Sequence, residues 1–249
     1  MNVAIIPARG NSKRIPKKNI REFHGRPMIS WSIEAARVAG CFERIIVSTD
    51  DSEIAEVARQ WGAEVPFERP SNLSDDHTGT AAVIRHAVEW LRNNKCNPEL
   101  VCCLYATAPF VTAKSLLEGL KLMKESDLAY AFTITSFPYP VQRALLLTPK
   151  GRVNMFYPEH MNLRSQDLEE AYHDAGQFYW GRPDAWLKES PLFGSHSAPI
   201  ILPRYRVQDI DTLEDWVRAE YMFEVIQRTL QHSLENETDE SSNTNSTQI

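Results

Sequence analysis

Apolar residues recur along the N-terminal half of the chain in two alternating patterns. Short apolar runs, typical of buried strands, occur at residues 2–8, 44–50, 99–109 and 128–137. Apolar positions at helical spacing predict helices at residues 27–40, 51–62, 75–94 and 113–126. Strands that alternate with helices favour an α/β domain with a mostly parallel sheet. Ligands of such sheets bind beyond the carboxyl ends of the strands, where "PARGNSKR", "STDD" and "YATAP" would converge.

The pattern changes after the fourth predicted strand. Residues 138–170 are rich in Pro and polar residues and contain a hairpin-like turn, "TPKGR", which predicts an insertion that projects from the sheet. The pattern then predicts two further strands and a helix, at residues 171–181, 199–211 and 212–230. We therefore expect a single domain over 1–231 that includes the insertion. The final segment, 232–249, is polar and has little to bury, so we expect it to be a disordered tail.

Composition narrows the class of protein. The 249 residues are 43% hydrophobic and 24% charged, enough apolar material for one sizeable core. The formal net charge is -6, which argues against broad nucleic-acid binding. Four scattered cysteines show neither metal-ligand spacing nor a disulfide framework, so a reducing compartment is expected. Because no basic leader or long apolar span is visible, we expect a cytoplasmic protein without membrane contact.

The residues after the first predicted strand form a basic loop, "PARGNSKRIPKKN". Its five cations are interleaved with small polar residues; they are Arg9, Lys13, Arg14, Lys17 and Lys18. Backbone N–H groups and cations in such a loop can surround a polyphosphate. The spacing matches neither a Walker loop nor the G-x-G-x-x-G dinucleotide motif. A solvated basic turn is the alternative interpretation.

An acidic pair near the other end of the chain is the second candidate for chemistry. Asp209 and Asp211 are two residues apart, so in an extended segment both carboxylates would point to one side and could hold a divalent cation, naturally Mg²⁺. The alternative is that Asp211 or Thr212 caps the helix that follows.

These segments together resemble a known family. "PARGNSKRIPKKN", "RIIVSTDD", "FERPSNLSDD", "ATAPF", "AGQFYW" and "DIDTLEDW" occur in the order found in the N-acylneuraminate cytidylyltransferases, and "RSQDLEEAYHDAGQFYWG" is most similar to their pseudaminic acid branch. The resemblance implies a Rossmann-like nucleotidyltransferase fold with a mostly parallel sheet. It also implies a reaction between CTP and a nonulosonic acid that gives a CMP-sugar and pyrophosphate, and a homodimer formed through the insertion.

The resemblance assigns roles to residues of the loop and its surroundings. It implies that nucleotide binding involves Arg9, Asn11, Ser12, Lys13, Lys18, Asn19, Arg69, Thr78 and Thr80. Arg9, Lys18 and Asp211 are the expected catalytic residues, with Mg²⁺ on Asp209 and Asp211. For residues 75–80 the alternative is structural, since Asp76 and Thr78 are good helix N-caps.

Sugar binding is expected to involve Tyr105, Arg164, Gln166, Gln177 and Tyr179, because a sugar acid needs cationic or amide donors and a polar wall with aromatic support. Tyr105 replaces a glutamine frequent in sialic acid synthetases, which favours pseudaminic acid. The alternatives are the same reaction on N-acetylneuraminic, legionaminic or 3-deoxy-octulosonic acid, or a nucleotide-binding module without turnover. The inserted lobe is expected to complete the sugar pocket of a partner subunit.

Overall fold

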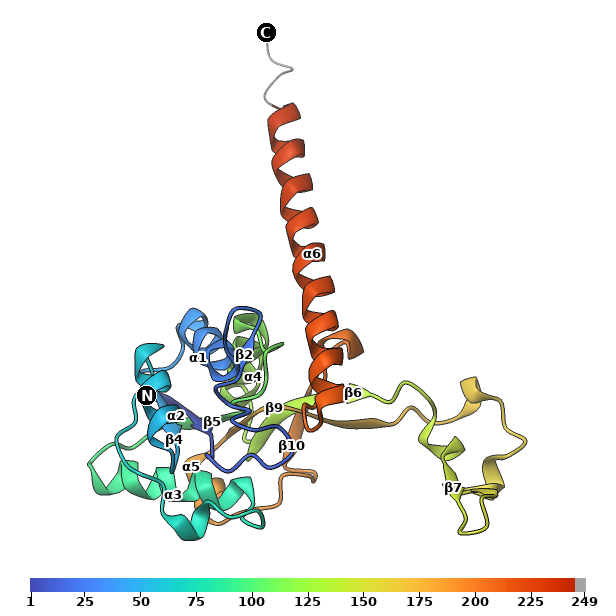
Figure 1. The fold of residues 1–249 in the computed structure, drawn as a ribbon, viewed down its shortest axis with the longest axis horizontal. Coiled ribbons are helices and arrows are strands. Elements are labelled where there is room, and N and C mark those ends of the chain that lie inside the picture. Colours follow the sequence, from blue (N-terminus) through green and yellow to red (C-terminus); the bar gives the residue numbers. More distant parts are fainter. Residues whose placement is uncertain (245–249) are drawn as a thin grey trace.

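The computed structural model describes residues 1–244, and side chains through residue 229. A six-stranded sheet lies at its centre, with the strand order β10-β6-β9-β5-β1-β4 (Figure 1). Its strands are β1 (Asn2–Pro7), β4 (Arg44–Ser48), β5 (Leu100–Leu104), β6 (Tyr130–Ser136), β9 (Tyr172–Gly181) and β10 (Ser197–Ile201). All neighbouring pairs are parallel except those of β9, which is antiparallel to both β5 and β6. The predicted α/β fold with a mostly parallel sheet is confirmed.

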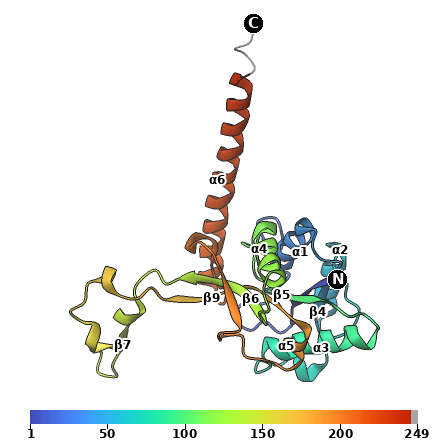
Figure 2. The same cartoon turned by 180° about the vertical axis from the view of Figure 1, so that it is seen from behind.

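Helices cover both faces of this sheet (Figure 2). They are α1 (Met28–Ala39), α2 (Ser52–Gln60), α3 (Thr80–Asn93), α4 (Ala113–Lys124) and the short α5 (Pro183–Leu187). The long helix α6 (Leu213–Thr244) extends away from the sheet for most of its length (Figure 1). The alternation of strand β1 explains the two layers. Ala4 and Ile6 belong to the core with α1 and α4, whereas Val3 and Ile5 belong to the core with α3 and α5. Period-two burial on both faces is expected of a strand in the middle of a sheet.

A third, smaller core connects the two ends of the chain. Ile15 of the basic loop and Phe23 of the two-residue strand β2 (Glu22–Phe23) are buried against Trp216 and Phe223 of α6. The ring of Phe23 meets Trp216 and Phe223 edge to face, at centroid distances of 5.5 and 5.4 Å. Strand β2 pairs with β3 (Arg26–Pro27). Burial of these large apolar groups fixes the basic loop beside the start of α6.

The insertion extends away from the sheet in both views (Figures 1 and 2). Strands β7 (Leu145–Leu147) and β8 (Val153–Met155) form an antiparallel hairpin around the "TPKGR" turn, in which Gly151 adopts a φ of 68°. The irregular chain, here and elsewhere, contains short 3₁₀ turns; they are η1 (Ser71–Leu73), η2 (Val141–Arg143), η3 (Pro158–His160), η4 (Ser165–Asp167) and η5 (Arg204–Arg206).

Two elements near the C-terminus differ from the expectation. The strand predicted over 199–211 ends at Ile201, because Pro203 has no N–H for the sheet and begins η5 instead. Helix α6 continues to Thr244, through most of the segment expected to be a disordered tail. No Gly or Pro follows Leu213, so each further residue adds a backbone hydrogen bond to a helix already nucleated on the core. The remaining tail positions, 245–249, lie outside the described residues.

Within the described part of the chain, no helix is long and apolar enough to span a membrane.

Candidate active site

A cleft of about 400 Å³ opens beyond the carboxyl ends of β1 and β5. The chain segments that line it are the basic loop, the connection from η1 to α3, the residues after β5 and the acidic pair before α6. Most of the sequence-predicted site residues line it, namely Arg9, Ser12, Lys13, Lys18, Asn19, Arg69, Thr78, Thr80, Tyr105, Asp209 and Asp211. Because the two charged segments share this one cleft, a polyphosphate and a metal could meet in it.

The backbone of the basic loop is held from two sides. The N–H of Gly10 donates to Oδ1 of Asp50 at 2.9 Å, and Nδ2 of the buried Asn19 donates to the carbonyl oxygen of Arg9 at 2.9 Å. A Cβ at Gly10 would lie 2.6 Å from Oδ2 of Asp51, so the loop passes this carboxylate more closely than any other residue type permits. The neighbouring Asn11 is exposed and lies outside the cleft lining.

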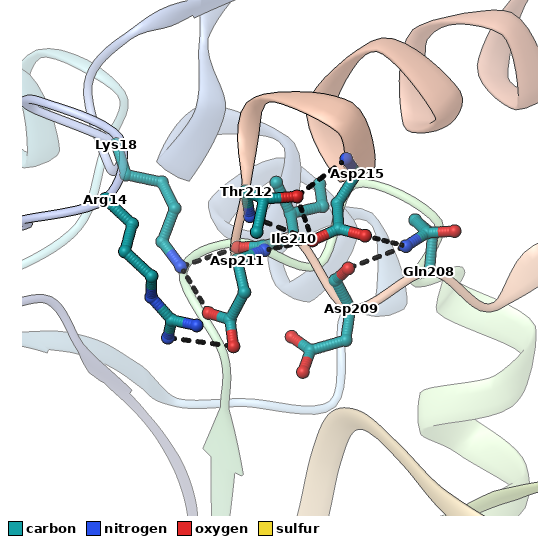
Figure 3. Close-up of polar contacts among 8 residues, drawn as sticks. All are labelled: Arg14, Lys18, Gln208, Asp209, Ile210, Asp211, Thr212 and Asp215. Carbon is teal, nitrogen blue, oxygen red and sulfur yellow. Dashed lines mark hydrogen bonds and ion pairs between the residues drawn. The ribbon is translucent and has the colours of Figure 1, made fainter. Parts of the chain in front are cut away.

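Two loop cations meet the acidic segment (Figure 3). Nζ of Lys18 donates to the carbonyl oxygen of Ile210 at 2.6 Å and lies 3.3 Å from Oδ1 of Asp211. Nη2 of Arg14 lies 2.9 Å from Oδ2 of the same carboxylate. Asp211 therefore has a cation on each of its oxygens.

The other two cleft cations meet the connection that leads to α3. Nη1 of Arg9 lies 3.0 Å from Oδ1 of Asp76 and donates to the carbonyl oxygen of Asp75 at 2.7 Å. Lys13 pairs with Oδ2 of Asp76. The fifth cation, Lys17, is directed elsewhere, because it pairs with Glu53 of α2 and does not line the cleft. Four of the five cations of the loop therefore border the cleft, although the side chains of Lys13 and Arg14 remain largely exposed to solvent.

The acidic pair lies in irregular chain, not in the predicted strand, yet both carboxylates line the cleft. Burial and the neighbouring charge of Asp211 raise the pKa of Asp209 above its usual value, while Lys18 acts in the opposite direction. Two carboxylates of like charge that interact in a cleft are poised to accept a cation.

The capping alternative for this segment is resolved by Thr212. The N–H of Asp215 donates to Oγ1 of Thr212 at 3.2 Å, and the N–H of Thr212 donates to Oδ2 of Asp215 at 2.8 Å (Figure 3). This reciprocal pair satisfies the first turn of α6. The carboxylate of Asp211 does not serve as a cap and is directed to the cleft.

The residues present fit a divalent metal ion only together with a ligand. Among the described residues, no group of three or more His, Cys, Asp or Glu side chains could hold a metal by itself. Asp209 and Asp211 offer carboxylate oxygens, the donors that Mg²⁺ prefers, and Mg²⁺ usually takes its other ligands from phosphates and water. The cations of the basic loop border the same cleft, where such phosphates would lie.

Arg69 is a structural cation of the cleft wall. Its Nε donates to Oγ of Ser48 at 3.1 Å and its Nη2 donates to the carbonyl oxygen of Ser48. Burial lowers the pKa of Arg69 to about 10, partly offset by Asp50. Arg69 is only 5% exposed, yet it borders the cleft.

The connection before α3 does not cap that helix through its side chains. Helix α3 begins at Thr80 with Gly79 as its N-cap, and no side chain accepts a hydrogen bond there. The expectation that Asp76 or Thr78 acts as the cap is wrong. Instead, the N–H and the hydroxyl of Thr78 both donate to Oδ1 of Asp75 at 2.7 Å, which folds the segment into a local turn.

The predicted sugar residues divide into three groups. Tyr105 borders the cleft, with its hydroxyl 3.3 Å from Oγ1 of Thr80, and burial raises its pKa to about 12. Tyr179 and Gln177 lie behind this wall; Tyr179 packs on Tyr105 at 5.3 Å between ring centroids and donates to Oδ2 of Asp174 at 2.6 Å. Gln177 is also buried, and its Nε2 donates to the carbonyl oxygen of Arg206 at 2.6 Å.

The third group is on the insertion, outside the cleft of its own chain. Arg164 is exposed and pairs with Asp167, with Nε to Oδ2 at 2.7 Å, and Gln166 lies in the adjoining turn η4. Neither residue lines the cleft.

Sequence reasoning missed the partners of the cations. Arg14 was visible as one of five basic residues, but the patterns did not single it out as a contact of Asp211. Asp76 was interpreted as a helix cap, and its contact with Arg9 and Lys13 depends on how the chain folds back over the loop. The "DD" dipeptide at residues 75–76 was the signal that the sequence offered for this pairing, far along the chain from the basic loop.

A mostly parallel α/β sheet with cations and carboxylates gathered in one cleft at its strand ends is compatible with a nucleotidyltransferase. The sequence profile described as "Cytidylyltransferase" matches residues 3–241. The chain belongs to the cytidylyltransferase family, and the resemblance found in the sequence is confirmed.

Similar proteins agree on the class. A pseudaminic acid cytidylyltransferase of Campylobacter jejuni is 46% identical over 224 residues, which are 90% of this chain and 97% of that protein. A CMP-N,N'-diacetyllegionaminic acid synthase of Legionella pneumophila is 29% identical over 238 residues, 92% of this chain and 98% of that protein. The solved structure of CMP:2-keto-3-deoxy-manno-octonic acid synthetase complexed with CTP has a TM-score of 0.66 at 17% identity and covers 89% of this chain and 98% of that one. At that identity the structural likeness shows the fold alone.

Proposed function

We propose that the protein transfers CMP from CTP to pseudaminic acid and releases pyrophosphate. The observation that carries the choice of acid is the 46% identity, over nearly the full length of both chains, to the Campylobacter jejuni pseudaminic acid cytidylyltransferase. The shared cleft of Lys18 and Asp211 supports the reaction, because it can bind a triphosphate and a metal side by side.

The reaction forms a bond between the C2 oxygen of the sugar and the α-phosphorus of CTP, and it breaks the bond from that phosphorus to the pyrophosphate oxygen. Phosphoryl chemistry of this kind depends mainly on positioning and charge neutralisation. Arg9, Lys13 and Lys18 lie in the cleft to bind the triphosphate and to stabilise the charge that develops on departing pyrophosphate.

We propose that Asp209 and Asp211 hold Mg²⁺. When bound there, the ion would lower the pKa of the attacking hydroxyl and neutralise phosphate charge. The chain's own contribution is the placement of two carboxylates beside Lys18, with Thr212 and Asp215 fixing the backbone that carries them. Isothermal titration of Mn²⁺, with and without CTP, would test the role of Asp209 and Asp211. Binding of Mn²⁺ should require both carboxylates.

Tyr105 supports the choice of sugar. It is the aromatic residue that borders the cleft, and Tyr179, itself held by Asp174, packs behind it. A wall of this kind can support one face of a polyhydroxylated ring. The Tyr105→Gln variant should lose rate with pseudaminic acid more than with N-acetylneuraminic acid.

The test of the proposed function is a panel of acceptor acids. Purified protein with CTP and Mg²⁺ should release pyrophosphate fastest with pseudaminic acid, and mass spectrometry should identify the CMP-sugar. Legionaminic, N-acetylneuraminic and 3-deoxy-octulosonic acids are the competitors. If one of these acids gives the higher kcat/KM in folded enzyme, the assignment of the sugar is wrong while the reaction class remains.

We further propose that the insertion forms a homodimer and that Arg164 and Gln166 reach the partner's sugar pocket. The insertion exposes many large apolar side chains that its own chain does not cover, among them Tyr139, Leu145, Leu147, Val153, Phe156 and Met161. A cluster of exposed large apolar side chains is typical of a protein interface. The exposed position of Arg164, away from its own cleft, supports a role in a second subunit.

Two experiments test the dimer. Leu147→Asp, at a side chain that is 72% exposed, should convert the protein to a monomer in light scattering, whereas Val38→Asp on α1, 62% exposed, should not. Mixing Lys18→Ala subunits with Arg164→Ala subunits, each impaired alone, should raise the activity above that of either variant if each pocket takes Arg164 from its neighbour. A fully active monomer, or no rescue on mixing, would contradict the proposal.

The protein is proposed to work in the cytoplasm. Its cysteines, Cys41, Cys96, Cys102 and Cys103, are free thiols, as expected in a reducing compartment.

A further inference from the structure

The carboxylate of Asp76 occupies the position beside Arg9 and Lys13 that a phosphate group would take. One oxygen of its carboxylate lies 3.0 Å from Nη1 of Arg9, and the other pairs with Nζ of Lys13. These are two of the cations that the proposed function assigns to the triphosphate. The contacts lower the pKa of Asp76, so at neutral pH the carboxylate is ionised and competes as an anion for the same donors.

A phosphate and Asp76 compete for these contacts. Nη1 of Arg9 has two N–H groups, and it already contacts the carboxylate of Asp76 and the carbonyl oxygen of Asp75. A phosphate oxygen that binds at Nη1 of Arg9 or at Nζ of Lys13 therefore competes with Asp76, and a triphosphate that takes both positions favours a conformation in which Asp76 has moved away.

The segment that carries Asp76 can move as a small unit. Asp75 organises it locally, since its Oδ1 accepts hydrogen bonds from the N–H groups of His77 and Thr78. The segment lies between the end of η1 and Gly79, ahead of the first turn of α3. Its side chains are solvent-accessible, with Asp76 33% exposed, so little buried surface opposes a displacement.

We propose that Asp76 is an internal competitor of the phosphate chain that sets the affinity for CTP and assists the release of pyrophosphate. In the free enzyme its carboxylate pairs with both Arg9 and Lys13. CTP displaces it because a triphosphate carries several negative charges and also reaches Lys18. After bond cleavage, the returning carboxylate competes with pyrophosphate for the two cations and speeds its departure.

The inference rests on the proposed function, and pyrophosphate is the probe that tests it. Asp76→Asn keeps the size of the side chain and removes the competing charge. Isothermal titration should show pyrophosphate and CTP binding about 3- to 10-fold tighter to this variant, the range expected from two exposed ion pairs. Cytidine, which has no phosphate, should bind equally to both proteins. Inhibition by pyrophosphate during turnover should strengthen by the same factor.

Asp75→Asn is the matched control. It removes the same charge from the neighbouring residue, whose side chain makes no ion pair with Arg9 or Lys13. Its effect on pyrophosphate binding should be much smaller. In a Lys13→Ala background, the gain from Asp76→Asn should shrink, since one of the two competed donors is gone.

Three results would overturn the proposal. They are unchanged or weaker pyrophosphate binding by Asp76→Asn, an equal gain in Asp75→Asn, or a gain that persists fully without Lys13. If neither wild type nor any variant binds CTP or pyrophosphate, the proposed function fails with it. If wild type binds both ligands and Asp76→Asn binds them no more tightly, only the inference about Asp76 fails.

Discussion

Nζ of Lys18 lies 3.3 Å from Oδ1 of Asp211, across a sequence separation of 193 residues. The small core of Ile15, Phe23, Trp216 and Phe223 brings these two segments together. A cation that can bind phosphate and a carboxylate that can bind a metal thereby face one another in a single cleft. This arrangement is what the transfer of a nucleotidyl group requires.

Replacement of Lys18 by Ala should reduce kcat by about 10²-fold, because a positioned cation that stabilises charge on the departing group acts mainly in the transition state. Steady-state release of pyrophosphate measures this effect. Lys17→Ala is the control, since Lys17 pairs with Glu53 outside the cleft. A change confined to KM would show that Lys18 only binds the ground state.

Replacement of Asp211 by Asn should weaken the Mg²⁺-dependent rate far more than it weakens folding. The carboxylate contacts Arg14 and Lys18 at the cleft, while the first turn of α6 keeps its cap from Thr212 and Asp215. A titration of the rate against Mg²⁺, together with urea unfolding, measures both effects.

The converse variant, Thr212→Ala, should lower the free energy of unfolding by about 1 kcal/mol through loss of the cap. Its dependence on Mg²⁺ should change much less than that of Asp211→Asn, because both carboxylates remain and the N–H of Asp211 still donates to Oδ2 of Asp215. An unchanged rate of Asp211→Asn at limiting Mg²⁺ would remove that carboxylate from the mechanism.

The sequence was sufficient for the main layers of this fold. Alternating apolar runs in β1 and β4, and helical spacing in α1 and α3, are local signals that buried elements must carry. These local signals could not predict that β9 is antiparallel, because Phe178 and Tyr179 are compatible with a buried strand in either direction. Pro203, which ends the last strand early, was a visible signal that the long strand prediction overlooked.

The charged segments of the candidate site were predictable, but their contacts were not. Residue type and spacing identified the basic loop and the acidic pair, since anions need cations and metals need carboxylates. The ion pairs depend on long-range packing and were not predictable, so the contacts of Arg14 with Asp211 and of Lys13 with Asp76 were missed. The position of Tyr179 behind Tyr105 was not predictable either, because a strand pattern does not reveal which side of a cleft wall a side chain occupies.

Gly10→Ala should reduce the affinity for CTP about 10-fold or more without unfolding the protein. A Cβ at this position would lie 2.6 Å from Oδ2 and 2.8 Å from Cβ of Asp51, so the phosphate loop must shift away from α2. Such a shift would also lengthen the hydrogen bond from Gly10 N–H to Asp50. Isothermal titration of CTP measures the loss, and circular dichroism checks the fold. Wild-type affinity in Gly10→Ala would show that the loop does not need this close approach.

His86 of α3 should make the stability of the protein depend on pH. Its Nδ1 is buried and has no hydrogen-bond partner in the described part of the chain, and its ring packs edge to face on Phe67 at 5.0 Å. Burial lowers the pKa of His86 below its usual 6.5; Glu89 opposes this and Arg69 adds to it. The folded protein therefore binds this proton less readily than the unfolded chain. The stability that neutral His86 contributes is complete above pH 6.5 and is lost as pH falls from 6.5 toward the lower folded pKa.

His86→Gln, which does not titrate, should gain up to about 1 kcal/mol of unfolding free energy relative to wild type between pH 7.5 and pH 5.5 in urea unfolding. Parallel pH profiles for the two proteins would show that His86 does not carry this dependence.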